Sequence, residues 1–121
     1  MAGTTAVPVE TTRTVRAQGE LDLVSAPSFR STLHGGASFT PAARVVVDLS
    51  DVTFMDVSPL RELCIATNRF EQQGGWVRLV YTDPTVARLL RATRLADRFP
   101  RYATIADARA GRTSPPGFPA R

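Results

Sequence analysis

The run RVVVDL, from Arg44 to Leu49, most constrains the fold of this chain, because it is apolar and rich in β-branched residues. Such a run is typical of a strand buried on both faces, with parallel neighbours in the middle of a sheet. A loop is expected after it, at Ser50-Asp51. The run therefore indicates an α/β fold, in which strands alternate with helices along the chain.

Apolar residues spaced three and four positions apart predict the helices. They are expected to begin at Ser25, Ser58 and Asp83, which are residue types that favour the N-cap position. A proline follows each of these closely and is tolerated in a first helical turn, where its missing N–H is not needed. Glycines at 74 and 75 should end the second helix, and Thr104 should begin a brief last one.

Strands are expected between these helices. Residues 4–18 alternate loosely and predict two short strands, the second of which Gly19 ends. Trp76–Tyr81 predicts a further strand, and Phe99–Tyr102 a last one that Pro100 confines to an edge. The two N-terminal strands should pair antiparallel. We therefore expect a mixed, mostly parallel sheet of about four or five strands packed with about four helices.

Length and composition place the chain among small globular domains. Its 121 residues, 43% apolar and 21% charged, are enough for one core, which we assign to residues 1–110. Residues 111–121 lack periodicity and predict a disordered tail. No apolar stretch approaches the roughly 20 residues that cross a bilayer, and the N-terminus does not resemble a signal peptide. A soluble, cytoplasmic protein is the expectation.

The formal net charge of +4 comes from arginine, because the chain contains no lysine. Arg88, Arg91, Arg94 and Arg98 recur at near-helical spacing, which is compatible with an acidic partner, with nucleic acid or with a solvated helix face. No aromatic residues are interleaved for base stacking, so direct nucleic-acid binding is not expected. Cys64 is a single cysteine at helical spacing, and we interpret it as a small buried hydrophobe rather than a redox site.

Catalysis is not expected of this chain. Its one histidine, His34, lies at a predicted helix end and is interpreted as a capping or surface residue. The sequence shows no Ser-His-Asp grouping, paired carboxylates, metal-ligand cluster or Gly-rich phosphate loop. We therefore expect no enzyme activity, no cofactor and no metal.

The stretch FMDVSPLREL, from Phe54 to Leu63, joins a predicted strand to a predicted helix. Ser58 and Pro59 fit an N-cap followed by the first helical position. Asp56 gains from the positive end of the helix dipole. The same arrangement of strand end, acid and helix N-terminus suits a phosphate.

Three segments, taken together and in order, resemble the sulphate transporter and anti-sigma factor antagonist (STAS) domain in its small bacterial form. They are GELD at Gly19–Asp22, VVVDLSDVTFMD leading to SPL at Val45–Leu60, and GGWVRLVYTDPTVARLLRATRLADRF at Gly74–Phe99. The resemblance covers roughly residues 5–110 and implies the STAS fold.

In the antagonist members of that family, the corresponding loop reads Asp-Ser-Ser-Gly-Leu or Asp-Ser-Thr-Gly-Leu. The serine after the aspartate is phosphorylated by an anti-sigma factor that is also an ATP-dependent kinase. Asp56 matches the aspartate and Val57 falls on the phosphoacceptor. Ser58 matches the second hydroxyl residue, Pro59 replaces the glycine and Leu60 matches the leucine.

The resemblance also matches Asp22 to an acidic residue near this loop. It implies a regulatory protein that binds an anti-sigma factor of the serine-kinase type through Asp22, Asp56, Val57, Ser58 and Leu60. Because valine has no hydroxyl, the usual phosphorylation switch is missing. The preferred hypothesis is therefore a cytoplasmic anti-anti-sigma factor, of undetermined oligomeric state, that is not regulated by phosphorylation at the usual position.

Two alternatives remain open. In one, Ser58 replaces Val57 as the phosphoacceptor, although an N-cap serine is usually structural. In the other, the STAS fold serves as a subunit of a lipid-transport ATPase complex or as a ligand-binding sensor, since fold alone does not fix function.

Overall fold

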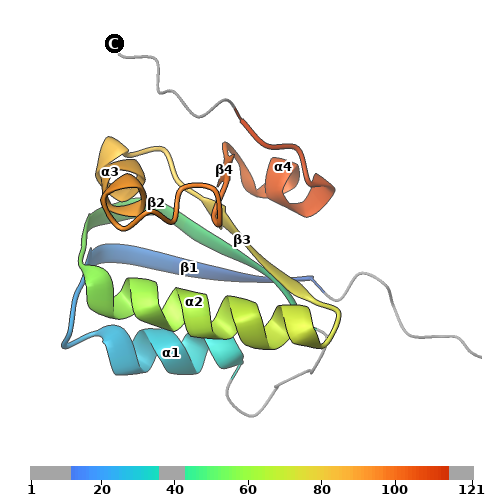
Figure 1. Ribbon diagram of the computed structural model, residues 1–121, viewed down its shortest axis with the longest axis horizontal. Coiled ribbons are helices and arrows are strands. Elements are labelled where there is room, and N and C mark those ends of the chain that lie inside the picture. Colours follow the sequence, from blue (N-terminus) through green and yellow to red (C-terminus); the bar gives the residue numbers. More distant parts are fainter. Residues whose placement is uncertain (1–11, 36–42, 115–121) are drawn as a thin grey trace, which may run out of the picture.

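The computed structural model describes residues 12–35 and 43–114, which form a sheet with helices on its faces (Figure 1). The strands are β1 (Thr12–Leu21), β2 (Arg44–Met55), β3 (Trp76–Val80) and β4 (Arg101–Tyr102). The helices are α1 (Ala26–His34), α2 (Val57–Gln72), α3 (Pro84–Ala92) and α4 (Ile105–Ala110). The predicted α/β alternation is confirmed across these residues.

The sheet has the order β1-β2-β3-β4, and each of its three strand pairs is parallel. Strand β4 pairs with only the end of β3, and it lies at the edge, as predicted for the segment around Pro100. The first predicted N-terminal strand, with its antiparallel pairing, lies outside the described residues. Parallel order has one main consequence for function: the C-terminal ends of all the strands lie at the same edge of the sheet.

Strand β2 is the central element of the core. Val45, Val46 and Val47 each have 0% exposure, so the strand is buried on both faces as its sequence predicts. The loop predicted at Ser50-Asp51 is wrong, because β2 continues through these residues to Met55. Their polar side chains resemble a turn in sequence, but the pairing with β1 continues past them and keeps the backbone extended.

The prediction that Gly19 ends the first described strand is also wrong. Strand β1 continues to Leu21, and Gly19 adopts φ +74° inside it. The register against β2 shifts next to Gly19, which is the signature of a β-bulge. The extra residue is Thr53 of β2, and Gly19 opposite it adopts its left-handed backbone without a Cβ penalty.

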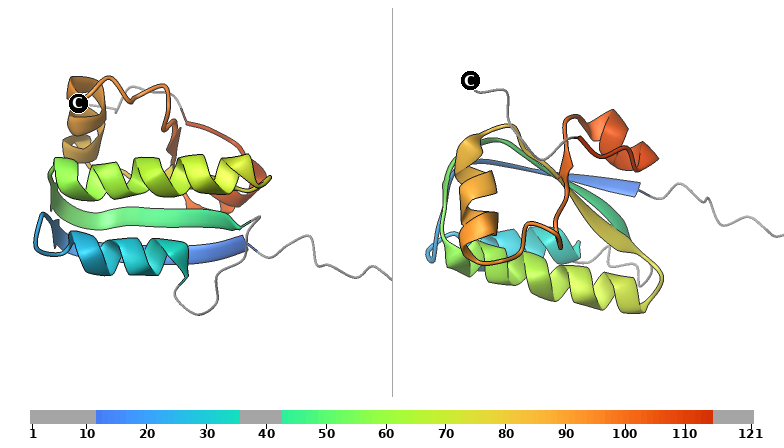
Figure 2. Two further views of the ribbon diagram at one scale, coloured as in Figure 1. Left: turned by 60° about the horizontal axis from the view of Figure 1, so that its bottom comes forward. Right: turned by 45° about the horizontal axis from the view of Figure 1, so that its top comes forward.

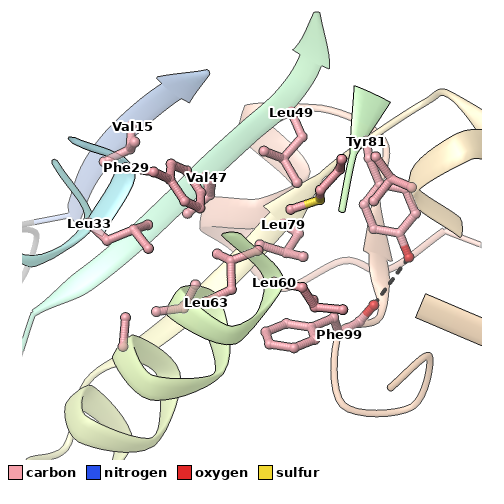
Figure 3. Close-up of a cluster of buried hydrophobic side chains, with 14 of the residues drawn as sticks. Val15, Phe29, Leu33, Val47, Leu49, Leu60, Leu63, Leu79, Tyr81 and Phe99 are labelled. Carbon is pink, nitrogen blue, oxygen red and sulfur yellow. Dashed lines mark hydrogen bonds between the residues drawn. The ribbon is translucent and has the colours of Figure 1, made fainter. Parts of the chain in front are cut away.

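Two apolar clusters pack on opposite faces of the sheet. Helices α1 and α2 lie side by side on one face, and α4 lies on the other (Figures 1 and 2). Alternation along β2 sends Val45 and Val47 to the larger cluster and Val46 to the smaller one. The larger cluster also holds side chains of α1, α2 and α3, including Phe70, Val86 and Leu90. Phe29, Leu33 and Leu63 belong to the same cluster (Figure 3).

The chain after α4 turns back onto the sheet. The Arg112 N–H donates to the Asp107 carbonyl (2.9 Å), and the Ser114 N–H donates to the Arg101 carbonyl (2.8 Å). Residues 115–121 of the predicted tail lie outside the described residues. None of the described helices has both the length and the apolar character that a bilayer crossing requires.

We expect Leu63→Ala to lower the free energy of unfolding by about 3 kcal/mol, because Leu63 is fully buried and its truncation leaves a cavity. Urea denaturation measures this loss. Ile65→Ala is the matched control on the same helix, because Ile65 is 47% exposed and should cost less than about 1 kcal/mol. Equal losses for the two variants would contradict the assigned orientation of α2.

Candidate functional site

Three aspartates follow three neighbouring strands at the C-terminal edge of the sheet. Asp22 follows β1, Asp56 follows β2 and Asp83 comes shortly after β3. The Asp56 and Asp83 side chains each accept a hydrogen bond from an early N–H group of the next helix, and the Asp22 side chain accepts from N–H groups of the turn before α1. These carboxylates therefore have a structural role, whatever else they do.

Asp56 is the N-cap of α2. Its Oδ1 accepts a hydrogen bond from the Ser58 N–H at 2.9 Å, and its backbone is extended. Its own N–H donates to the Leu21 carbonyl at 3.1 Å, which ties the end of β2 to the end of β1. This bond brings the Asp22 loop and the start of α2 together.

The prediction of Ser58 as the N-cap is therefore wrong. The helix begins at Val57, which makes Ser58 the second helical residue and Pro59 the third. Proline is tolerated there because the first four N–H groups of a helix have no partner within the helix. The Ser58 hydroxyl makes no hydrogen bond to any described residue, so it is not committed to capping.

Ser25 occupies the N-cap position of α1, as predicted, but the side chain that accepts hydrogen bonds in the β1–α1 loop is that of Asp22. The Asp22 Oδ1 accepts from the N–H groups of Val24 (3.0 Å) and Ser25 (3.1 Å). In return, the Ser25 Oγ accepts from the Asp22 N–H (2.9 Å), as in a capping box. Ser25 stands before α1 but makes no side-chain cap bond to it.

Asp83 confirms its predicted capping role. Its Oδ1 accepts from the Thr85 N–H at 2.7 Å, and Pro84 occupies the first helical position of α3. Hydrogen bonds from Thr85 lower the pKa of Asp83, helped by the positive charge of Arg88. The charged carboxylate is the form that caps the helix.

The two loops that follow β1 and β2 contain most of the large exposed apolar side chains of the described residues. We call residues 21–25 and 54–58 the corner. Large apolar side chains of the corner with more than a third of their area exposed are Leu23 (71%), Val24 (86%), Phe54 (45%) and Val57 (55%). Ile65, two helical turns after Val57 on the same side of α2, adds a fifth. Exposed apolar residues that gather in this way indicate a contact surface.

A shallow pocket lies beside the corner, between the N-terminal halves of α1 and α2. Its volume is about 230 Å³. The lining residues are Leu23, Ala26, Pro27, Arg30, Ser58, Arg61 and Glu62. Ser58 therefore faces a space that contains two guanidinium groups, one carboxylate and an exposed leucine. The site therefore combines exposed apolar side chains with a pocket lining that carries two positive charges and one negative charge.

Leu60 is the predicted site residue that the structure does not bring to this surface. It is 3% exposed and belongs to the larger core cluster. Asp22, Asp56 and Ser58 are half-buried, and Val57 is exposed. Four of the five predicted contact residues thus lie in the corner. The fifth, Leu60, points into the core (Figure 3).

Cys64 and His34 lie outside the corner. Burial raises the pKa of the Cys64 thiol, which opposes thiolate chemistry and agrees with its packing against the core. The His34 ring packs against Phe70 with centroids 5.6 Å apart, and its Nδ1 is buried without a hydrogen-bond partner among the described residues. Across residues 12–35 and 43–114, no three metal-ligating side chains cluster as an ion would require.

The comparison with known families assigns the chain. Residues 5–108 match the STAS domain family, so the chain belongs to that family. It is similar to an anti-sigma factor antagonist from Mycobacterium paratuberculosis, with 27% identity and a TM-score of 0.73 over 90% of this chain and 92% of that one.

Two more distant structures share the fold. The antagonist SpoIIAA in its unphosphorylated form has 20% identity and a TM-score of 0.67, covering 83% of this chain and 87% of that one. A sulfate transporter family protein from Wolinella succinogenes has 14% identity and a TM-score of 0.68, covering 89% and 88%. The predicted α/β STAS fold is confirmed.

Sequence reasoning did not single out Leu23, Val24 or Ile65 as surface residues. Leu23 and Val24 carry a signal in retrospect, because they are large apolar residues between a capping aspartate and a helix. Ile65 departs from the apolar face of α2 but shares a side with Val57, eight residues earlier. Apolar residues off the buried face are the signal for such a surface.

We expect Asp56→Ala to lower the free energy of unfolding by about 1 kcal/mol, because it removes the N-cap of α2. Asp56→Asn keeps an acceptor oxygen and should change stability by only a few tenths of a kcal/mol. Chemical denaturation separates the two variants. A loss of the same size in both would show that charge, rather than capping, is what Asp56 contributes.

Stability should also depend on the protonation of His34. Burial, aided by the nearby Arg69, lowers the His34 pKa from 6.5, so the unfolded chain binds this proton more readily than the folded protein. The contribution of neutral His34 is therefore complete above pH 6.5 and is lost as the pH falls below it. We expect His34→Gln to flatten the decrease in urea midpoint between about pH 7.5 and 5.5. Parallel pH curves for both proteins would contradict this.

Proposed function

We propose that this protein is an anti-anti-sigma factor that binds an anti-sigma factor of the serine-kinase type in the cytoplasm, without phosphorylation at the usual position. The observation that carries the proposal is Val57. It occupies the family's phosphoacceptor position, is 55% exposed, and stands among other exposed apolar side chains. The similarity to an anti-sigma factor antagonist at 27% identity supports the choice of partner class.

The proposed binding rests on contact with the exposed apolar side chains of the corner, whose two loops are held in place by hydrogen bonds. Capping by Asp22 and Asp56 holds the two loops, and the Asp56 N–H bond to the Leu21 carbonyl joins them. A partner would bury Leu23, Val24 and Val57, which stabilises a complex through the hydrophobic effect. A phosphate in place of Val57 would add nearly two negative charges there and oppose that burial.

The experiment mixes the protein with purified kinase-type anti-sigma factors and ATP, follows binding by calorimetry, and records the intact mass afterwards. The native chain should bind without gaining mass. Val57→Ser should bind and then gain one phosphate. A native chain that gains a phosphate would contradict the proposal, and failure of both forms to bind would favour a transporter subunit or a sensor.

A negative charge placed on the corner should mimic the phosphate of the missing phosphorylation switch. We expect Val57→Asp to weaken binding at least about tenfold, because a partner must desolvate the carboxylate. Ala106→Asp, at an exposed position of α4, adds the same charge away from the corner and should leave affinity within about twofold. Equal weakening by both variants would place the contact elsewhere.

Ser58 is a second candidate phosphoacceptor, favoured by one observation. Its hydroxyl is free of capping and lines the pocket between Arg30 and Arg61, whose charges would stabilise a phosphate. The mass measurement with Ser58→Ala tests it. Phosphate that appears on the native chain and disappears in this variant would assign the modification to Ser58.

A further inference from the structure

The exposed surface of α3 and the turn after it is cationic. Arg88, Arg91 and Arg94 are exposed, and none of their side chains makes a hydrogen bond or a salt bridge to a described residue. Arg98, the fourth arginine of the sequence pattern, differs from them. Its guanidinium pairs with the Glu71 carboxylate at 3.1 Å and with the Asn68 amide oxygen at 2.7 Å.

Arg94 occupies a backbone conformation that favours glycine. Its φ is +63°, the only positive φ of a non-glycine residue in the described part of the chain. The turn requires this conformation, because the Arg94 N–H donates to Arg91 and the Leu95 N–H reaches back to the Leu90 carbonyl at 2.7 Å. Glycine would form the same turn at lower energy, so the side chain of Arg94 is retained at a cost to stability.

The adjoining pocket can receive an acidic side chain. Arg91 lines a pocket of about 340 Å³ together with Arg101 and the hydroxyl-bearing residues Thr113 and Ser114. The lining residues include one acid, Asp97, so the cations outnumber the anions. The Arg101 Nε donates to the Tyr81 carbonyl at 2.7 Å, so recognition of a carboxylate is assigned to the Arg91 guanidinium.

We propose that Arg88, Arg91 and Arg94 form a binding surface for an acidic segment of a protein partner. An acidic protein segment fits better than nucleic acid, because the residues from Pro84 to Arg98 include no aromatic side chain for base stacking. It also fits better than a lipid surface, because the large apolar residues of α3 are turned inward: Val86 and Leu90 are buried and Leu89 is partly buried. The surface is built from different elements than the corner and does not depend on the proposed function.

The test uses fluorescence anisotropy at low salt with a labelled peptide of alternating glutamate and alanine. Arg88→Gln/Arg91→Gln should weaken binding roughly fivefold, and Arg94→Gly roughly twofold, since exposed ion pairs are individually modest. Arg16→Gln/Arg109→Gln removes the same charge from exposed sites elsewhere and should leave the affinity unchanged. Arg94→Gly should also raise the melting temperature by a few degrees, so lost binding in this variant cannot reflect unfolding.

Two further probes, a DNA duplex and phosphatidylcholine vesicles containing phosphatidylserine, decide the class of partner. The proposal expects any binding of these probes to fall equally in the two double variants, as an effect of net charge alone. The proposal is overturned if peptide binding falls equally in the two double variants. It is also overturned if DNA or vesicle binding depends on Arg88, Arg91 and Arg94 and peptide binding does not. If Arg94→Gly binds the peptide with native affinity and is more stable, Arg94 takes no part in the binding surface. Its positive φ would then be no sign of a binding role.

Discussion

Strand β2 pairs in parallel with β1 on one side and β3 on the other, and its three consecutive valines are fully buried. Parallel pairing sends every strand toward the same edge of the sheet, so each chain reversal into a helix occurs there. The Asp22 loop and the start of α2 thus become neighbours, and the Asp56 N–H bond to the Leu21 carbonyl joins them. The burial of one strand determines where a partner surface can form.

At the end of each strand the chain continues into a helix, whose first N–H groups need hydrogen-bond acceptors. A helix that starts directly after a strand leaves N–H groups without acceptors, and a short polar side chain in the last extended residue supplies one. Asp56 and Asp83 do so after β2 and β3, and Thr104 does so after β4, whereas Asp22 accepts from the turn that precedes α1. Because the polar side chains are used internally at the corner, the side chains left for contact are mainly apolar. Val57 is one of these exposed apolar side chains.

The sequence was sufficient for the elements whose signal is physical and local. The β-branched run of β2 and the Asp-Pro start of α3 need no knowledge of their neighbours, and both are confirmed. The N-cap of α2 was misplaced because aspartate and serine are about equally good caps and both occur near its start. The bond between the Asp56 N–H and the Leu21 carbonyl is long-range, and it favours Asp56 by holding it extended.

The candidate site was predicted only in part, because some of its features depend on long-range packing and pairing. Asp22, Asp56, Val57 and Ser58 lie in the two joined loops of the corner, but whether Leu60 points to the core depends on the packing of α2. The length of β2 beyond Ser50 was likewise set by pairing with β1 and not by its own residues. Local chemistry predicts which residues cap and which are apolar, whereas the sheet decides which of them reach solvent.

Amide chemical-shift mapping on the ¹⁵N-labelled protein, titrated with a kinase-type anti-sigma factor that binds it, tests the central claim most directly. The account predicts the largest shifts in residues 21–25 and 54–58 and along the exposed side of α2 as far as Ile65, with α4 unaffected. Shifts concentrated on α4 and β4, with Leu23, Val24 and Val57 unchanged, would contradict the assignment of the corner as the partner surface.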